Sequence, residues 1–368
     1  MALTFLVRRD DLRRTRFATG APTPPSGPGP RAVLRVERFA LTSNNLFYAS
    51  FGESLSFFNY FPVEDPAWAC VPAWGYSTVE SSELEGITPG ERYFGYVPMA
   101  THFTVLPVKG NAGSFLDTAP NRPVSIPIYN TYRPSAVDPL HSLELEPALA
   151  VFRPIFTTSF VLADFLSDND YFGAEQVVVS SASSKTAYGT AYALSRPRRP
   201  SVVGLTAPKN RAFVERLGVY DSVVAYPDAA TLPVARTIYV DVASNPALRR
   251  TLRERLGENL VRDLRVGGSH WDSRAGNVGT GIDDGSSAAA PEQFLAATQI
   301  ARRTADFGPA GFQGNVATAL SAFLSRATAG ETPWVRFVTA SGEEAVSRAY
   351  DEVVSGRASP EEAYVLEM

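Results

Sequence analysis

The sequence predicts an α/β protein with two domains, a β-rich domain followed by a doubly wound α/β domain. The 368 residues suffice for two domains of ordinary size, and the 45% hydrophobic content can supply a core to each. In the first 150 residues, short alternating segments such as Ala32–Ala40 are separated by Pro and Gly, as in a barrel or sandwich of short strands. From Gln176 onward, apolar strands alternate with amphipathic helices, which indicates a parallel sheet covered on both faces.

The β-rich part carries three further local signals. Tyr93–Tyr96 and Thr101–Val108 are expected to be strands, because apolar and polar residues alternate in them. Ala21–Pro30 is rich in Pro and Gly and is expected to form a loop, since proline lacks a backbone donor.

The α/β part is predicted element by element from its hydrophobic periodicity. The expected strands are Gln176–Ser181, Ser201–Thr206, Val223–Ala225, Thr237–Val242 and Leu260–Val266. The expected helices are Thr157–Leu166, Lys185–Ser195, Lys209–Leu217 and Pro246–Leu256. A surface excursion is expected over Arg274–Pro291, which has little to bury. The C-terminal part, expected to complete one of the two domains, adds helix Val316–Ala327, strand Trp334–Thr339 and helix Ser341–Val354.

Composition excludes several classes of protein. The net charge of −4 and the pI near 5.6 provide no electrostatic footprint for nucleic acid. The single cysteine, Cys70, rules out a disulfide within the chain and a four-cysteine zinc site. No apolar run approaches the roughly 20 residues that span a bilayer, and the N-terminal apolar segment is too short for a signal peptide. We therefore expect a cytoplasmic protein without membrane partners.

The turn after the first strand of the α/β part is a candidate phosphate site. Small residues open a helix there, so backbone N–H groups and the helix dipole could seat a phosphate. The glycine fingerprint of dinucleotide sites is absent, and Ser181, Ser184 and Ala187 stand at comparable positions. The alternative is an ordinary strand-to-helix turn that binds nothing. The residues that could contact a phosphate here are Ser181, Ser183, Ser184, Lys185 and Thr186.

The end of the second strand favours NADP(H) over NAD. An NAD site usually places Asp or Glu there to bind the ribose diol, and this strand end carries no carboxylate. Thr206, Lys209 and Arg211 instead offer a hydroxyl and two cations, which suit a 2′-phosphate. The alternative is that Lys209 and Arg211 are solvated residues of a first helical turn.

These motifs, in this order, resemble the medium-chain dehydrogenase/reductase superfamily. Gly173–Ala187 and Val202–Asp228 are similar to its strand, turn and helix pattern, including the "xLGAD" run, which here reads LGVYD. Gly86–Val105 resembles the "PGDRV" segment, and Ala345–Leu366 resembles the superfamily's usual ending. The zinc-independent quinone oxidoreductase and enoyl reductase branches look most similar among named enzymes. The sequence as a whole looks closer to a related family of unknown function.

The resemblance implies a GroES-like β-barrel domain and a doubly wound Rossmann domain. The GroES-like domain would cover residues 1–150, completed by the tail 325–368, and the Rossmann domain 151–324, with NADP(H) in the cleft. Lys209 and Tyr226 take positions that contact the 2′-phosphate in quinone oxidoreductases. Trp74–Ser77 replaces the "GHE" zinc segment, so we expect no catalytic metal. The strand-end residues implied near the ribose and nicotinamide are Asp241, Gly268 and Ser269.

Three residues are the main candidates for catalysis, and a fourth is a weaker one. Asn45 and Tyr48 lie in a stretch that resembles the cleft lining of zinc-free relatives, and Tyr60 is a weaker candidate of the same kind. His270 follows the strand expected near the nicotinamide and could hydrogen-bond a substrate carbonyl, with Trp271 as an apolar wall. The alternatives are structural: Asn45 as a helix cap, Tyr48 in the core, and His270 as a packing residue.

Two classes of function follow. The first is an NADP(H)-dependent, zinc-independent oxidoreductase that reduces an apolar activated alkene, quinone or carbonyl by hydride transfer. Nine aromatic residues between Phe47 and Trp74 would suit an apolar small-molecule substrate, and a barrel core explains them as well. The second class is a non-redox dinucleotide sensor or lyase-like protein on the same scaffold, because fold does not determine function. A homodimer is compatible with either class.

Overall fold

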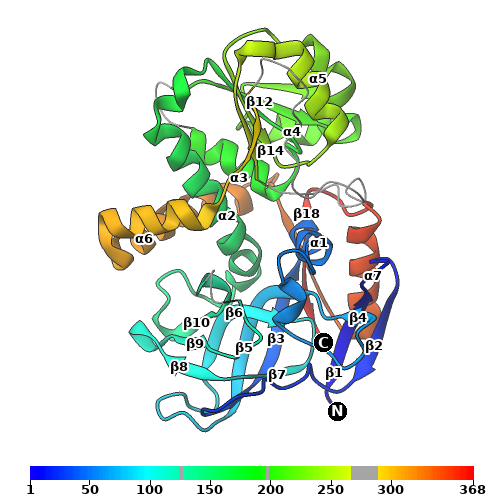
Figure 1. The fold of residues 1–368 in the computed structure, drawn as a ribbon, viewed down its shortest axis with the longest axis vertical. Coiled ribbons are helices and arrows are strands. Elements are labelled where there is room, and N and C mark those ends of the chain that lie inside the picture. The colour runs from blue at the N-terminus through cyan, green and yellow to red at the C-terminus, as the bar shows by residue number, and fades with distance from the viewer. Residues whose placement is uncertain (124–126, 196–198, 267–288) are drawn as a thin grey trace. The chain divides into compact units, whose positions relative to one another are not determined.

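The computed structural model describes residues 1–123, 127–195, 199–266 and 289–368, and the chain divides into two compact units (Figure 1). The N-terminal unit comprises Met1–Val151 together with Arg336–Met368. The central unit comprises Phe152–Val335. The chain thus passes from a β-rich unit to an α/β unit and then returns to the first.

The N-terminal unit consists mainly of β-strands. Its strands are β1 (Leu3–Arg8), β2 (Thr15–Thr19), β3 (Ala32–Leu41), β4 (Trp68–Ala69), β5 (Pro72–Ser82), β6 (Arg92–Pro98), β7 (His102–Val105), β8 (Pro107–Lys109), β9 (Phe115–Asp117), β10 (Thr131–Pro134), β17 (Arg336–Ser341) and β18 (Glu362–Glu367). Its α-helices are α1 (Ser43–Ser50) and α7 (Glu343–Val354). The larger sheet has the order β17-β18-β3-β5-β6-β10-β9-β8, with β7 also paired to β3, and a smaller sheet has the order β2-β1-β4.

The strand expected over Thr101–Val108 is in fact two strands. β7 pairs with β3, whereas β8 pairs with β9, so the chain changes partner at Leu106. The backbone N–H of Leu106 donates to Asp117 Oδ1 at 3.0 Å, which satisfies the amide at the corner. Cys70 directly follows β4 of the smaller sheet; it is fully buried, and burial raises the pKa of its thiol to about 12.

The C-terminal segment belongs to the sheet of the N-terminal unit. β18 pairs antiparallel with β3 and parallel with β17, so the last strand of the chain lies between β17 and β3 in this sheet.

In the same unit, Glu146 is buried without exposed surface and is neutralised by Arg92, at 2.5 Å, and by Arg38, at 3.4 Å. A carboxylate at such a position is tolerated because both cations lie within ion-pair distance.

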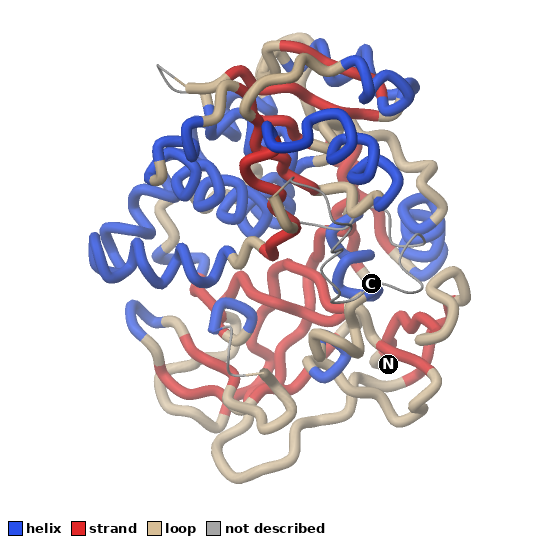
Figure 2. The backbone as a smooth tube through the Cα atoms, turned by 45° about the horizontal axis from the view of Figure 1, so that its top comes forward, coloured by secondary structure: helices blue, strands red, loops and turns tan. Residues whose placement is uncertain are grey.

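The central unit contains a six-stranded parallel sheet flanked by helices (Figure 2). Its strands are β11 (Gln176–Val179), β12 (Ser201–Thr206), β13 (Ser222–Ala225), β14 (Thr237–Asp241), β15 (Leu260–Arg265) and β16 (Pro291–Gln293). Its helices are α2 (Glu146–Asp168, starting in the N-terminal unit), α3 (Lys185–Leu194), α4 (Arg211–Leu217), α5 (Pro246–Leu256) and α6 (Ala296–Thr328). The strand order is β13-β12-β11-β14-β15-β16, and every pair is parallel.

The central strands of the sheet are mostly apolar and buried because both faces of the sheet are covered there. Val177, Val178 and Val179 of β11 have no exposed surface. On one face, α5 inserts Leu252 into a buried cluster that includes Tyr239 of β14. The predicted strands therefore agree with the observed ones to within a few residues. The expected excursion Arg274–Pro291 lies mostly outside the described residues, and β16 begins at its last residue.

Helix α2 starts earlier than the expected Thr157–Leu166, because Pro154 does not interrupt it. Loss of one backbone donor is offset by burial of the flanking residues Val151, Phe152 and Phe156. α2 has 23 residues, and an 18-residue stretch of it has a mean hydropathy of 1.5, so by length and composition it could cross a membrane, contrary to the expectation from the sequence. Since 61% of this apolar stretch is buried within the protein, α2 has the character of a core helix.

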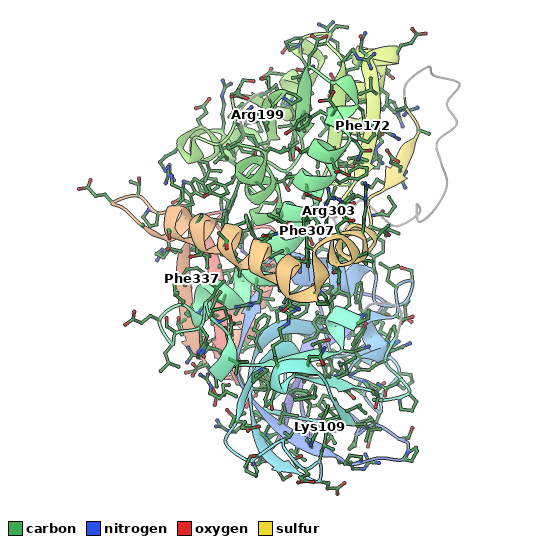
Figure 3. The ribbon with its side chains drawn as sticks, turned by 90° about the vertical axis from the view of Figure 1, so that its left-hand side faces the viewer. Lys109, Phe172, Arg199, Arg303, Phe307 and Phe337 are labelled. Atoms are coloured by element: carbon green, nitrogen blue, oxygen red, sulfur yellow. The ribbon has the colours of Figure 1, made fainter. Side chains whose placement is uncertain are left out.

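Helix α6 explains why the boundary to the C-terminal tail falls at Arg336, later than the expected residue 325. Phe323 stacks on Phe156 of α2 at 4.6 Å, and Trp334 contacts Tyr188 of α3 at 5.9 Å, so this stretch stays with the central unit. Before its kink at Gly308, α6 is tied to α2 through Arg303, which pairs with Asp164 at 2.6 Å (Figure 3).

Gly75 of β5 provides a test of the β3–β5 packing. A Cβ atom at this position would lie 2.2 Å from the carbonyl oxygen of Arg38 and 2.9 Å from Cα of Phe39, both backbone atoms that cannot rotate away. We expect Gly75→Ala to destabilise the protein by about 1–3 kcal/mol or more in urea unfolding. Gly314→Ala in α6 is the control, since nothing lies within 4 Å of its Cβ position and alanine favours helix. Equal stability of the two variants would contradict the packing described.

Candidate functional site

The topology of the central sheet brings three strand ends together. From the central strand β11 the chain proceeds outward through β12 and β13, and then crosses to β14 on the other side of β11. Ligands of doubly wound sheets bind at such a switch point, beyond the carboxyl ends of the strands. The segments that lie there are those that follow β11, β12 and β14, beginning at Ser180, Ala207 and Val242.

The turn after β11 adopts the backbone conformation that a glycine would favour. Ser181 has a φ of +52°, in the left-handed region, which costs a non-glycine residue about 1–2 kcal/mol. Its N–H donates to the hydroxyl of Tyr226 at 3.0 Å, and its carbonyl accepts from the N–H of Ser184 at 2.7 Å. On the next residue, the carbonyl of Ala182 accepts the hydroxyl of Tyr220 at 2.9 Å. The turn is thus fixed by two tyrosines that the sequence brings from beyond β12.

Helix α3 begins directly after this turn. Ser184 is its N-cap, and its hydroxyl accepts the N–H of Ala187 at 3.3 Å. Lys185 and Thr186 form the first helical turn and are partly exposed. Ser183 is bridged to the segment after β12, since its hydroxyl accepts from Asn210 Nδ2 at 3.0 Å. The predicted phosphate residues 181–186 therefore surround one helix N-terminus, where backbone N–H groups and the helix dipole favour an anion.

The end of β12 holds a buried hydroxyl and two cations. Thr206 is 1% exposed, and within the described part of the chain its Oγ1 has no hydrogen-bond partner. Lys209 is exposed on the short 3-10 helix Pro208–Asn210. Arg211 starts α4 and pairs with Glu215 at 2.8 Å. An unpaired buried hydroxyl is costly, so Thr206 fits a site whose missing partner is a ligand.

Asp241, at the end of β14, faces inward and holds the strand ends together. Its Oδ1 accepts the hydroxyl of Ser180 at 3.0 Å and the N–H of Ser244 at 2.8 Å. Its Oδ2 pairs with Arg249 of α5, and the whole side chain has no exposed surface. The oxygens of Asp241 thus bind protein groups and connect Ser180 to the loop after β14, and a role of Asp241 near a ribose stays a prediction.

A second buried carboxylate adjoins this one on β15. Asp263 has no exposed surface, and its Oδ2 lies 3.2 Å from Nε of Arg249 and 3.9 Å from Nη1 of Arg253. Burial raises the pKa of Asp263 to about 6, and Arg249 counteracts this only in part. Burial also lowers the pKa of Arg265 on the same strand, with the charge of Arg249 acting in the same direction.

The catalytic candidates Asn45 and Tyr48 lie on α1 in the N-terminal unit. Asn45 completes a capping box, because its Oδ1 accepts the N–H of Thr42 at 2.9 Å, and its Nδ2 donates to the carbonyl of Pro72 at 3.1 Å. Tyr48 is buried, and its hydroxyl accepts from Asn44 Nδ2 and from Trp74 Nε1, both at 2.9 Å. These contacts agree with the structural roles considered above, Asn45 as a helix cap and Tyr48 as a core residue. A direct part in catalysis stays a prediction.

Tyrosines that the sequence analysis did not single out surround Tyr48. The ring of Tyr96 lies 5.3 Å from that of Tyr48, and the ring of Tyr129 lies 4.8 Å from that of Tyr96. Tyr60, the weaker candidate, belongs to the same cluster, with its ring 5.1 Å from that of Tyr96. Burial raises the pKa of the Tyr60 hydroxyl to about 12. Only the contacts between distant segments reveal this cluster.

Other predicted residues lie outside the described part of the chain: Gly268, Ser269, His270 and Trp271. Among the described residues, no group of three His, Cys, Asp or Glu side chains could hold a metal ion. Sequence reasoning also missed Asn210 and Tyr220. Their partners, Ser183 and Ala182, are 27 and 38 residues away in the chain, so no local pattern marks them.

The segments after β11 and β12 carry hydrogen-bond donors and positive charge of the kind that binds the phosphates of a dinucleotide. The N-terminus of α3, the hydroxyl of Thr206 and the cation of Lys209 supply donors and positive charge at one sheet edge. No carboxylate that would repel a 2′-phosphate stands at the end of β12. Ser181 makes the glycine-like conformation available without a glycine.

Comparisons with known proteins agree with this architecture. Residues 39–359 match the model of a family described as "Protein of unknown function (DUF2855)". No curated protein sequence matches the chain. Three solved structures are similar, and each match covers 100% of this chain and 99% of the other chain. They are CurA from Vibrio vulnificus in complex with NADPH (TM-score 0.62, 12% identity), the CurK enoyl reductase (TM-score 0.56, 9% identity) and a candidate NADPH:quinone reductase from Bacillus thuringiensis (TM-score 0.54, 12% identity). These likenesses confirm the expected fold, a GroES-like β-barrel domain with a doubly wound Rossmann domain.

The raised pKa of Asp263 predicts an unusual pH dependence. A carboxyl group that is protonated more readily in the folded state contributes most to stability below about pH 4, and this contribution falls as the pH rises to about 6. We expect Asp263→Asn to remove that fall, so that the variant gains stability relative to wild type between pH 4 and 6. Urea unfolding across this range measures the difference. Glu254→Gln, at an exposed site on α5, should give a flat difference, and a flat difference for Asp263→Asn would refute the assignment.

Proposed function

The chain belongs to the DUF2855 family, and we propose that this member is an NADPH-dependent, zinc-independent oxidoreductase acting on an apolar small molecule. The observation that carries the proposal is the sheet edge at the switch point. There, a left-handed turn and a helix N-terminus adjoin a strand end that has Thr206 and Lys209 in place of a carboxylate.

The solved structures support the cofactor and the reaction class. CurA was solved with NADPH, and the other two are described as an enoyl reductase and a candidate quinone reductase. We propose the same kind of substrate for this chain, an activated alkene, a quinone or a carbonyl compound. The aromatic cluster around Tyr48 supports an apolar substrate.

The residues of the central unit would bind the cofactor in three places. Lys185 and Thr186 in the first turn of α3, with Ser183 just before its N-cap, would bind the pyrophosphate. Thr206 would hydrogen-bond the adenosine ribose or its phosphate, and Lys209 would pair with the 2′-phosphate. When bound, the nicotinamide would supply a hydride. Arg211, which pairs with Glu215, would add positive charge beside Lys209.

In the N-terminal unit, Tyr48 would act as a proton donor to the substrate, and the groups around its hydroxyl would support this role. Its hydroxyl accepts hydrogen bonds from Asn44 and Trp74 and also contacts the hydroxyl of Tyr129, so the proton that it would donate belongs to a hydrogen-bonded group of tyrosines. Burial raises the pKa of Tyr48, which keeps the phenol protonated at neutral pH. Asn45 would fix the start of α1 and thereby the position of Tyr48.

A non-redox dinucleotide-binding protein is the second candidate function. It is favoured by Ser181 and Ala187 at the glycine positions, because their Cβ atoms restrict the approach of a pyrophosphate to the backbone. Such a protein would bind NADPH without transferring hydride.

Cofactor preference tests the assignment of Lys209. We expect NADPH to bind at least tenfold more tightly than NADH, since a charge-assisted contact contributes about 1.5–3 kcal/mol and tenfold corresponds to roughly 1.4 kcal/mol. Lys209→Ala should remove most of this preference, as measured by quenching of tryptophan fluorescence. Arg216→Ala removes the same charge from the last turn of α4 and should leave the preference unchanged. Equal affinity of the wild type for both cofactors would disprove the NADPH assignment.

Turnover distinguishes the two candidate functions. We expect loss of NADPH absorbance at 340 nm when enones or quinones are added, and the same rate after dialysis against a chelator, because hydride transfer from the nicotinamide needs no metal. Binding of NADPH without any substrate-dependent oxidation across the panel would favour the non-redox function. Loss of activity on chelation, restored by zinc, would show that the metal assignment is wrong.

A further inference from the structure

Tyr226 lies at the start of the short 3-10 helix Tyr226–Thr231, directly after β13. β13 pairs with β12 so that Ala225 stands beside Thr206. From there the tyrosine side chain crosses the end of β12 and reaches the turn after β11, where its hydroxyl accepts the N–H of Ser181 at 3.0 Å. The ring packs against the apolar cluster of the central sheet, so its position is set by the core.

The hydrogen bond is made to the one residue of the turn that has an unfavourable backbone conformation. Ser181, with a φ of +52°, would relax toward a negative φ unless contacts hold it. A glycine at this position would need no such support, since it adopts positive φ freely. The Ser181 hydroxyl also contacts the Tyr226 hydroxyl, so the backbone and side-chain contributions need separate tests.

We propose that Tyr226 is a positioning residue that holds the phosphate turn in its left-handed conformation and thereby compensates for the missing glycine. This role differs from a direct contact with a 2′-phosphate, which the sequence resemblance implies for Tyr226. It rests on the proposed function where it concerns the cofactor. The turn geometry itself is independent of any ligand.

The two roles predict different cofactor dependence for Tyr226→Phe. A positioning residue prepares the site for the part that both cofactors share, so the variant should bind NADPH and NADH more weakly by the same factor, about tenfold. A 2′-phosphate ligand would lose affinity for NADPH alone. Dissociation constants from fluorescence quenching measure this, and a loss confined to NADPH would overturn the proposal.

Substitutions of Ser181 separate the backbone conformation from the hydroxyl contact. Ser181→Gly removes the cost of positive φ, so adding Tyr226→Phe in this background should change the NADPH affinity by less than about twofold. Ser181→Ala keeps that cost and removes only the hydroxyl, so the loss of about tenfold should persist there. An equal loss in the glycine and alanine backgrounds would overturn the proposal.

A measurement without cofactor keeps the inference separate from the proposed function. Hydrogen exchange of the backbone amides at 180–184 should become faster in Tyr226→Phe, because the Ser181 N–H loses its acceptor. The control, Tyr132→Phe, removes a buried hydroxyl bonded to the carbonyl of Tyr96 in the N-terminal unit, and should leave this exchange unchanged. Unchanged exchange in Tyr226→Phe would refute the positioning role. Failure of wild type to bind either cofactor would count against the proposed function alone.

Discussion

The central unit depends on a buried carboxylate, Asp241, at the switch point between β11 and β14, where the order of the strands reverses. Asp241 receives hydrogen bonds from the end of β11, through Ser180, and from the loop after β14, through Ser244, while Arg249 of α5 balances its charge. Removing water from such a group is costly, and the cost is recovered only when all partners are in place. The Asp241 interactions therefore form only when β11, β14 and α5 are all in their native positions.

This condition has consequences for the segments at the candidate site. With the end of β11 fixed, the chain has only a few residues to reach the N-cap Ser184, and it does so through the left-handed Ser181. Tyr220 and Tyr226 then bind the turn from the side of β12 and β13. The buried charges of Asp241 and Arg249 hold the strand ends together, whereas the proposed ligand would meet the partly exposed first turn of α3 and the exposed Lys209.

Sequence patterns predicted the strands better than the roles of single residues. β11 and β14 are fully buried and β12 is buried after its first residue, and a run such as Gln176–Val179 has few other stable arrangements. The boundary at Arg336 was missed because it depends on aromatic contacts of Phe323 and Trp334, which no periodicity encodes. Asp241 was expected near a ribose, and its buried contacts with Ser180, Ser244 and Arg249 depend on the tertiary structure, so the sequence pattern did not predict them. Ser183 and Ser184 lie together at the start of α3, as their adjacency in one turn predicts, and their contact with a phosphate stays a prediction.

The buried Cys70 has a practical consequence for experiments. It is the only cysteine in the chain, it has no exposed surface, and burial raises the pKa of its thiol to about 12, so it stays protonated and inert toward alkylating reagents. A fluorophore or spin label directed at one introduced cysteine on each unit would therefore attach only there, with no need to remove the native thiol. The distance between the two labels, followed during cofactor titration, would report directly on whether the units close upon a ligand.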